Sequence, residues 1–160
     1  MRVIGVDPGY DRLGVAVLEY ETDGKETVLF STCIETNKKA TLNERLHTLG
    51  EAFNTILTTH TPSALAIETL FFNQNQKTAI GVAAARGIII FLAQQHNCVV
   101  HEFGPQEVKV ALTGYGKSDK QAVTDMVTRL VRNVPKKALD DEYDAIAVAT
   151  TCLATFGRTK

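Results

Sequence analysis

Four carboxylates occupy positions where a core-building sequence has little use for charge. Asp7 and Glu68 each end a short apolar run. Asp141 and Asp144 open an apolar helical stretch, and their spacing of three residues places both on one helical face. A carboxylate at the end of a buried strand costs free energy unless it is paired, hydrogen-bonded or bound to a metal. These four acids are therefore candidate functional residues.

The chemistry that such a set supports is metal-assisted hydrolysis of a phosphodiester. Ligands collect at the carboxyl ends of strands in α/β sheets, so Asp7 and Glu68 are expected side by side if their strands are neighbours. Like charges that close repel unless a cation lies between them, and Mg²⁺ prefers carboxylate and water oxygens. Four carboxylates suit two such ions, which clamp a phosphodiester at a separation of about 3.5–4 Å.

Each acid also has an ordinary explanation when it is taken alone. Asp7 precedes Pro8-Gly9 and is a plausible turn former. Asp141 and Asp144 suit the positive end of a helix dipole. Glu68 is the hardest to explain this way, because strands disfavour glutamate. All four acids together, in this order, favour a functional site.

Length and composition indicate one globular domain over residues 1–160. The hydrophobic fraction is 44% and the charged fraction 22%, which excludes disorder, collagen and coiled coil. The longest apolar run, at 87–93, is far shorter than the roughly 20 residues that span a bilayer, so no membrane association is expected. The three separated cysteines lack a CxxC pattern, and the N-terminus lacks an export signal, so we expect a cytoplasmic protein.

Charge is unevenly distributed along the chain. The net charge is -1, which argues weakly against a nucleic-acid partner. Residues 105–137, however, hold seven Lys and Arg against three acids, so this stretch carries +4 and the remainder -5. A basic stretch beside an acidic cluster is what a metal-dependent nuclease needs, although on charge alone a solvated helix surface is the simpler explanation.

The predicted elements place these residues in an α/β fold. Strand patterns cover 1–6, 14–20 and 27–34, and turn signals between them indicate an antiparallel meander. Thr41 and Glu44 form a capping-box pattern at the start of a helix that ends near Thr61-Pro62. The rest alternates a strand at 64–68, a helix at 75–96, a strand at 98–103 and helices at 105–113, 118–132 and 141–155. This order predicts a five-stranded mixed sheet, antiparallel and then parallel, with helices on both faces.

This pattern resembles the RuvC family of Holliday-junction resolvases, which have the RNase H-like fold. The resemblance covers about residues 1–155, and five short pieces in the same order carry it. They are Ile4-Gly5-Val6-Asp7-Pro8-Gly9, Ala66-Ile67-Glu68 with Phe71, Ala84-Ala85-Arg86-Gly87, Val108-Lys109 with Thr113-Gly114-Tyr115-Gly116 and Lys120, and Asp141-Glu142-Tyr143-Asp144-Ala145.

The resemblance implies a homodimeric, Mg²⁺-dependent endonuclease of recombination and repair that makes paired symmetric nicks in four-way DNA junctions. The products would be a 5′-phosphate and a 3′-hydroxyl. Asp7, Glu68, Asp141 and Asp144 match the catalytic metal ligands of the family. They would hold two Mg²⁺ ions per active site, with Mn²⁺ as an alternative.

Five further residues are predicted to contact DNA. Lys109 matches a lysine near the scissile phosphate and is also assigned to catalysis, and Lys120 matches one near the DNA backbone. Phe71 matches an aromatic residue that stacks on bases near the crossover, which suits a sequence-tolerant reader. Arg86 lies within one of the matching pieces. Lys117 lies in a turn between two predicted helices, which either presents it to phosphate or is a plain turn.

Several departures leave alternatives open. Val15-Ala16 stands where the family has an aromatic residue and glycine, and Asp140 leaves the ligand register uncertain by one residue. The N-terminal segment also looks like the YqgF family, relatives proposed to process ribosomal RNA precursors. A junction-binding module that does not cut is a further alternative. An actin-like ATPase or sugar kinase needs a second lobe, for which 160 residues leave no room.

A homodimer is also expected on symmetry grounds, because a junction presents two symmetric scissile strands and C₂ proteins match such targets. The predicted helix at 75–96 is the expected interface, and a branch-migration helicase complex is a further partner left open. The small residues that would permit close helix approach are Ala79, Gly81, Ala83, Ala84 and Gly87.

Overall fold

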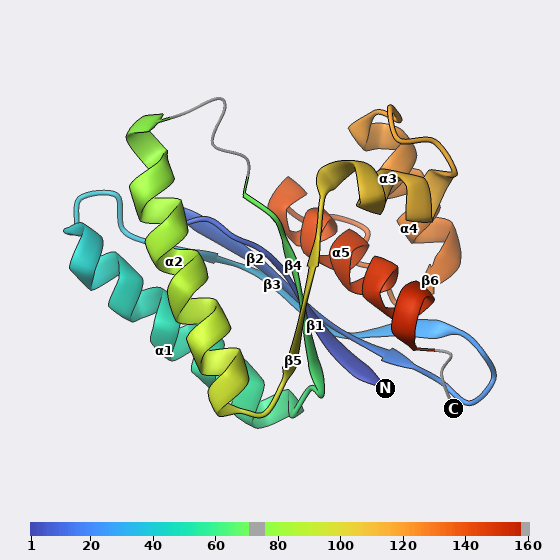
Figure 1. Ribbon diagram of the computed structural model, residues 1–160, viewed down its shortest axis with the longest axis horizontal. Coiled ribbons are helices and arrows are strands. Elements are labelled where there is room, and N and C mark those ends of the chain that lie inside the picture. Colours follow the sequence, from blue (N-terminus) through green and yellow to red (C-terminus); the bar gives the residue numbers. More distant parts are fainter. Residues whose placement is uncertain (71–75, 158–160) are drawn as a thin grey trace.

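The protein forms a six-stranded mixed sheet with helices on both faces (Figure 1). We describe residues 1–70 and 76–157 from a computed structural model. The strand order is β5-β4-β1-β2-β3-β6, so β1 lies inside the sheet between β4 and β2. The elements in chain order are β1 Arg2–Asp7, β2 Arg12–Tyr20, β3 Glu26–Glu35, α1 Leu42–His60, β4 Ala64–Glu68, α2 Gln76–Gln95, β5 Val99–Phe103, α3 Pro105–Thr113, α4 Lys120–Leu130, β6 Val131–Arg132 and α5 Asp140–Phe156.

The expected mixed topology is confirmed. β1, β2 and β3 form the antiparallel meander, and β4 and β5 join it in parallel beside β1. The capping box is also confirmed, since the Thr41 amide donates to Glu44 Oε2 at 2.8 Å and the Glu44 amide donates to Thr41 Oγ1. Every predicted strand and helix is present, with boundaries shifted by a few residues at most.

The strand β6 was not expected from the sequence. The prediction of helix through residue 132 is wrong, because α4 ends at Leu130 and Val131 adopts extended geometry with φ -108° and ψ 137°. Val131 and Arg132 then pair in parallel with Glu26 and Thr27 of β3. Two residues are too few to carry an alternating pattern, so this sixth strand has no sequence signature of its own.

Alternation along the strands builds a separate core on each face of the sheet. Val3 packs in the core under α3, α4 and α5, whereas its neighbour Ile4 packs in the core under α1 and α2. This follows from the period of two in a strand. Figure 1 shows the two helical layers on opposite sides of the sheet. Three free cysteines are present, with Cys98 and Cys152 buried and Cys33 half-buried.

Helix α5 lies unusually close to the two central strands at two glycines. A Cβ on Gly5 would lie 2.2 Å from the Ala145 carbonyl oxygen, and one on Gly14 would lie 1.8 Å from the Asp141 carbonyl oxygen. Any side chain at either position would collide with the helix backbone. The missing side chains therefore allow the acidic first turn of α5 to rest directly on β1 and β2.

Helix α2 corrects the expectation that the chain has no stretch of membrane-spanning character. Its 18 residues Thr78–Gln95 have a mean hydropathy of 1.4, so by length and composition alone they could cross a bilayer. Ala85, Ile89 and Ala93 of α2 belong to the core of the domain. Only 22% of the stretch is buried, however, so α2 also presents an apolar face outward.

The close approach at Gly14 generates a stability prediction. Gly14→Ala drives a methyl group into the Asp141 backbone, which cannot move without displacing α5, so we expect a loss of about 3 kcal/mol in the free energy of unfolding. Urea denaturation measures this loss. The control is Gly116→Ala, whose added methyl comes no closer to any atom than 3.3 Å, at the Val110 side chain. Equal stability of the two variants would contradict the packing argument.

Candidate active site

Parallel pairing of β1 with β4 brings two of the predicted acids together. Val6 of β1 lies opposite Ile67 of β4, and the next residues are Asp7 on β1 and Glu68 on β4. Both carboxylates therefore stand at the same carboxyl edge of the sheet, where α/β folds place their ligands. Each residue is half-buried, in contrast to the fully buried residues that precede it.

The first turn of α5 adds the other two acids to this edge. The Asp141 side chain is 23% exposed and the Asp144 side chain 34% exposed, whereas the Asp140 side chain is 78% exposed. Asp141 and Asp144 share the helix face that lies on the sheet, as their spacing predicts. The exposed Asp140 carboxylate lies 3.3 Å from Lys120 Nζ.

The pKa values of the acids record their mutual proximity. Burial, followed by the charges of Asp144, Glu68 and Asp141, raises the pKa of Asp7 to about 7. Burial and then the Asp144 charge raise the pKa of Glu68, and burial raises the pKa of Asp144 despite its bond to Lys120. Three of the carboxylates thus resist ionisation in this structure, which is the electrostatic signature of a cation-binding or catalytic site.

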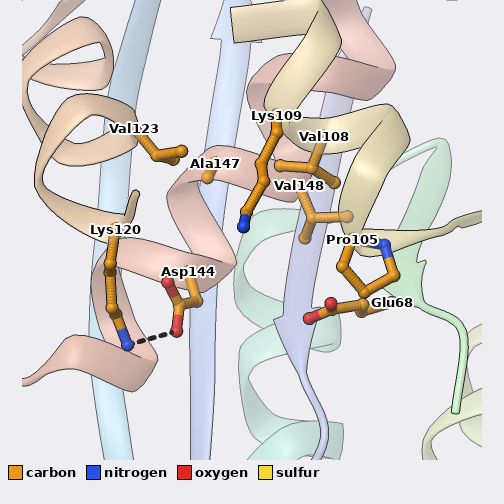
Figure 2. A pocket seen from close by; sticks show the side chains of 9 residues that line it. All are labelled: Glu68, Pro105, Val108, Lys109, Lys120, Val123, Asp144, Ala147 and Val148. Atoms are coloured by element: carbon orange, nitrogen blue, oxygen red, sulfur yellow. Dashed lines mark hydrogen bonds and ion pairs between the residues drawn. The ribbon is translucent and has the colours of Figure 1, made fainter. Parts of the chain in front are cut away.

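A pocket of about 240 Å³ opens beside these acids, with Glu68 and Asp144 on its walls. Figure 2 shows the Lys109 side chain reaching from α3 toward the space between the two carboxylates. Lys109 also lowers the pKa of Glu68 against the larger effect of burial. Asp7 lines an adjoining hollow that shares Glu68 with the pocket. The remaining pocket walls are Pro105, Val108, Lys120, Val123, Ala147 and Val148.

Lys120 lies at the acids themselves. Its Nζ donates to Asp144 Oδ2 at 2.9 Å and lies 3.3 Å from Asp140 Oδ2 (Figure 2). Burial lowers the pKa of Lys120, but Asp144 and Asp140 outweigh this effect and leave the pKa above its usual value. The family resemblance assigns Lys120 to the DNA backbone, and in this structure its ammonium neutralises the helix acids.

Arg12 also lies next to the acids, a position that the sequence did not predict. Its Nε lies 3.6 Å from Asp141 Oδ2, and its side chain is about half exposed at 49%. The contact exists because Gly14, two residues along β2, lets the Asp141 backbone approach the strand. An arginine at the start of a strand carries no local signal of this contact, since the contact depends on how α5 packs.

The four acids lie at one edge of the sheet, but their side chains are not arranged as a set of metal ligands. Within residues 1–70 and 76–157, no three Asp, Glu, His or Cys side chains are arranged to hold a metal ion together. Two cationic side chains instead lie against the acids of α5, Lys120 at Asp144 and Arg12 at Asp141. The donor set itself fits a hard divalent cation, because all four groups are carboxylates that repel one another.

The remaining predicted DNA contacts lie away from this pocket or outside the described residues. The Arg86 guanidinium on α2 lies 2.6 Å from Glu102 on β5, and its side chain is only 18% exposed. Lys117 is exposed in the turn between α3 and α4. Phe71 lies outside the described residues. Of the five predicted DNA contacts, the structure brings Lys109 and Lys120 to the acids.

The fold and the site together define a class of protein. An antiparallel β1–β3 meander, a parallel β4 beside β1 and acids at the ends of both strands and on α5 are the arrangement of RNase H-like nucleases. A family model described as crossover junction endodeoxyribonuclease RuvC matches residues 3–152. The chain belongs to the RuvC family. This match includes the N-terminal segment that also resembles the YqgF family.

Individual relatives agree with this assignment. The crossover junction endodeoxyribonuclease RuvC of Thermosipho melanesiensis is 43% identical over 156 residues, which cover 96% of this chain and 97% of the relative. The solved structure of Thermus thermophilus RuvC is 30% identical, with a TM-score of 0.86 over 100% of this chain and 99% of that one. A second structure, T. thermophilus RuvC in complex with Holliday junction substrate, is 29% identical with a TM-score of 0.87 and covers 94% of this chain and 92% of that one.

The raised pKa of Asp7 predicts an unusual dependence of stability on pH. A folded Asp7 ionises near pH 7 and an ordinary aspartate near 3.8, so ionisation opposes folding and stability falls as the pH rises through this window. Asp7→Asn removes the ionisation. With a chelator present, we expect the variant to exceed the wild type in free energy of unfolding by on the order of 3 kcal/mol at pH 8 and less than about 1 kcal/mol at pH 4.

Urea denaturation at the two pH values measures the difference. Asp125→Asn at an exposed position of α4 serves as the control and should give the same small change at both pH values. An Asp7→Asn effect that does not grow with pH would show that the acids do not repel one another as described.

Proposed function

We propose that this chain is a Mg²⁺-dependent endodeoxyribonuclease that resolves four-way DNA junctions by paired symmetric nicks. The observation that carries the proposal is the convergence of Asp7, Glu68, Asp141 and Asp144 from three elements at one sheet edge, next to a lysine-lined pocket. Membership of the RuvC family supports the substrate class, as does the relative whose structure contains a Holliday junction.

The four acids are proposed to hold two divalent cations, with Mn²⁺ able to replace Mg²⁺. The repulsion that raises the pKa of Asp7 supports this role, because a bound cation attracts each carboxylate and so offsets their mutual repulsion. When bound, such a pair of ions supplies an activated water and stabilises the leaving 3′-oxygen, which leaves a 5′-phosphate and a 3′-hydroxyl. The protein contributes a rigid sheet edge and helix turn that fix where the carboxylates stand.

Burial and the influence of its charge on Asp7 favour Asp141 over Asp140 as the ligand from the start of α5. Asp141 acts on the pKa of Asp7, and its side chain is 23% exposed. Asp140 is 78% exposed and pairs with Lys120. A ligand shared with Asp7 has to face the sheet, so we assign the metal to Asp141 and leave Asp140 as a surface partner of the lysine.

The lysines are proposed to act on the phosphate. Lys109 extends toward the space between Asp144 and Glu68 (Figure 2), so its ammonium can offset charge that builds on the reacting phosphate. Lys120 donates to Asp144 in this structure, and a cation bound by that carboxylate would leave the ammonium available to the DNA backbone. Lys117, Arg86 and Phe71 stay predictions as DNA contacts.

A side-by-side cleavage assay tests the function. Substrates are a synthetic mobile four-way DNA junction, a linear duplex and a structured RNA, each at low salt with Mg²⁺, because phosphate contacts weaken steeply with salt. We expect symmetric nicking of the junction alone. Asp7→Asn should abolish cleavage and keep junction binding, and Asp141→Asn should do the same, whereas Asp140→Asn should cut within about threefold of wild type.

Other outcomes point elsewhere. Cleavage of the RNA without cleavage of the DNA junction would indicate a YqgF-like activity on RNA. Junction binding without cleavage in either Mg²⁺ or Mn²⁺ identifies a non-cleaving module. Loss of cleavage in Asp140→Asn, with normal cleavage in Asp141→Asn, reverses the ligand assignment.

A homodimer through α2 is proposed as the active assembly. Ile80 is 76% exposed and Phe91 64% exposed on this helix, and they are separated by 11 residues, close to three helical turns. A groove of about 450 Å³ between α1 and α2 includes Phe91 on its wall. A two-fold partner that presents the same face would cover these residues and place two sites against two scissile strands. The predicted role of Gly81 in close helix approach is wrong, because Gly81 is buried against Tyr10 of the same chain.

Sedimentation velocity at micromolar concentration tests the dimer. The wild type should sediment as a dimer and Phe91→Glu as a monomer, because a charge in the centre of an apolar interface is strongly unfavourable. Leu130→Glu, which changes an equally apolar residue that is 50% exposed on α4, should remain dimeric. A monomeric wild type would overturn the proposal. Partnership with a branch-migration helicase and a cytoplasmic location stay predictions.

A further inference from the structure

A buried arginine braces the turn that follows Asp7. Arg45 of α1 is 8% exposed, and among the described residues it is the only charged side chain buried to this degree. Burial of a guanidinium costs free energy unless its donors are paired and hydrogen-bonded. The residues that contact Arg45 therefore indicate which part of the structure the buried charge stabilises.

The Arg45 side chain contacts residues 10 and 11 directly and also through Thr36. Its Nη2 donates to Asp11 Oδ1, and its guanidinium carbon lies 4.6 Å from the centre of the Tyr10 ring. Its Nε donates to Thr36 Oγ1 at 2.9 Å. Thr36 in turn donates its hydroxyl to the Tyr10 carbonyl at 2.7 Å and its amide to the Asp11 carbonyl at 3.0 Å. The arginine thus holds both the side chains and, through Thr36, the backbone of this turn.

The Tyr10 ring also fills a space that α2 leaves for it. A Cβ on Gly81 would lie 2.7 Å from Tyr10 Cδ1 and 2.8 Å from Cε1, so any side chain larger than hydrogen would displace the ring. Gly81 is buried. The ring is therefore fixed by Arg45 from α1 and by Gly81 from α2, the two helices of the face opposite α5.

We propose that Arg45 and Tyr10 are positioning residues for the nuclease site. They fix the turn between β1 and β2, and Asp7 is the last residue of β1, immediately before this turn. A metal-ligating carboxylate has to be held within about 0.5 Å of its working position, and an isolated strand end does not provide this. The inference rests on the proposed function only in that Asp7 is taken as a metal ligand.

Gly81→Ala is the most discriminating variant. The added methyl crowds the Tyr10 ring, so thermal stability should fall whether or not the turn positions Asp7, and a merely structural role for Gly81 predicts unchanged cleavage by the folded variant. A positioning role instead predicts single-turnover junction cleavage slower by about tenfold, since small misplacements of reacting groups are costly. Junction affinity measured with a chelator should stay within about twofold of wild type, because neither residue lies in the lysine-lined pocket.

Arg45→Lys is the second variant, and Tyr10→Phe is the matched control. Lysine keeps the charge but lacks the planar fork that binds Thr36 and Asp11 together, so it should reproduce the effect of Gly81→Ala. Phenylalanine keeps the ring that packs on Gly81 and should behave as wild type. If Arg45→Lys does not fold, Gly81→Ala decides the question by itself.

Mn²⁺ binding without DNA supplies a readout that does not depend on cleavage. Calorimetry should show Mn²⁺ affinity about tenfold weaker in Gly81→Ala and Arg45→Lys and unchanged in Tyr10→Phe. Wild-type affinity and cleavage in both variants would overturn the inference, as would weaker junction binding with normal Mn²⁺ affinity. A wild type that binds Mn²⁺ and cuts no junction would refute the proposed function, and the Mn²⁺ titrations would still decide the role of Arg45.

Discussion

The close contact of α5 with the two central strands is the constraint on which the site depends. Gly5 and Gly14 leave no room for a side chain, so the helix backbone rests on β1 and β2. A hydrogen bond from Ser31 on β3 to Glu142 holds the first turn of the helix at the sheet. Because the acids of α5 lie in this turn, the same contact that packs the core also brings Asp141 to Asp7. Fold and site therefore share one interface, and neither can shift without the other.

Assembly of the acids works against the stability of the fold. Burial and three neighbouring carboxylates raise the pKa of Asp7 to about 7, which means that its ionised form is disfavoured where it stands. Lys120 and Arg12 reduce the repulsion by pairing with Asp144 and Asp141, but Arg12 is half exposed and such pairs contribute little by themselves. A site strained in this way is expected where function, rather than packing, has selected the residues.

The acids and the main elements could be read from the sequence, because charge at the end of an apolar run and strand or helix periodicity are local signals. Contacts made only by tertiary packing could not. β6 is two residues long and forms through β3, and Arg12 meets Asp141 only because Gly14 admits the helix. Arg45 lies in an ordinary amphipathic helix, and nothing in its neighbours along the chain distinguishes it from a surface arginine. The apolar character of α2 was missed because small residues and Arg86 interrupt it.

The two faces of the sheet carry different tasks in the proposed enzyme, and the turn after β1 is where they meet. Chemistry belongs to the face of α3, α4 and α5, whose lysines and acids surround one pocket. The proposed dimer contact uses the face of α1 and α2, which exposes Phe91. Tyr10 packs on Gly81 of α2, three residues along the chain from Asp7. A nuclease that must cut two strands together needs its partner contacts and its metal ligands in a fixed relation, and in the proposed dimer the packing of Tyr10 on Gly81 would connect the two.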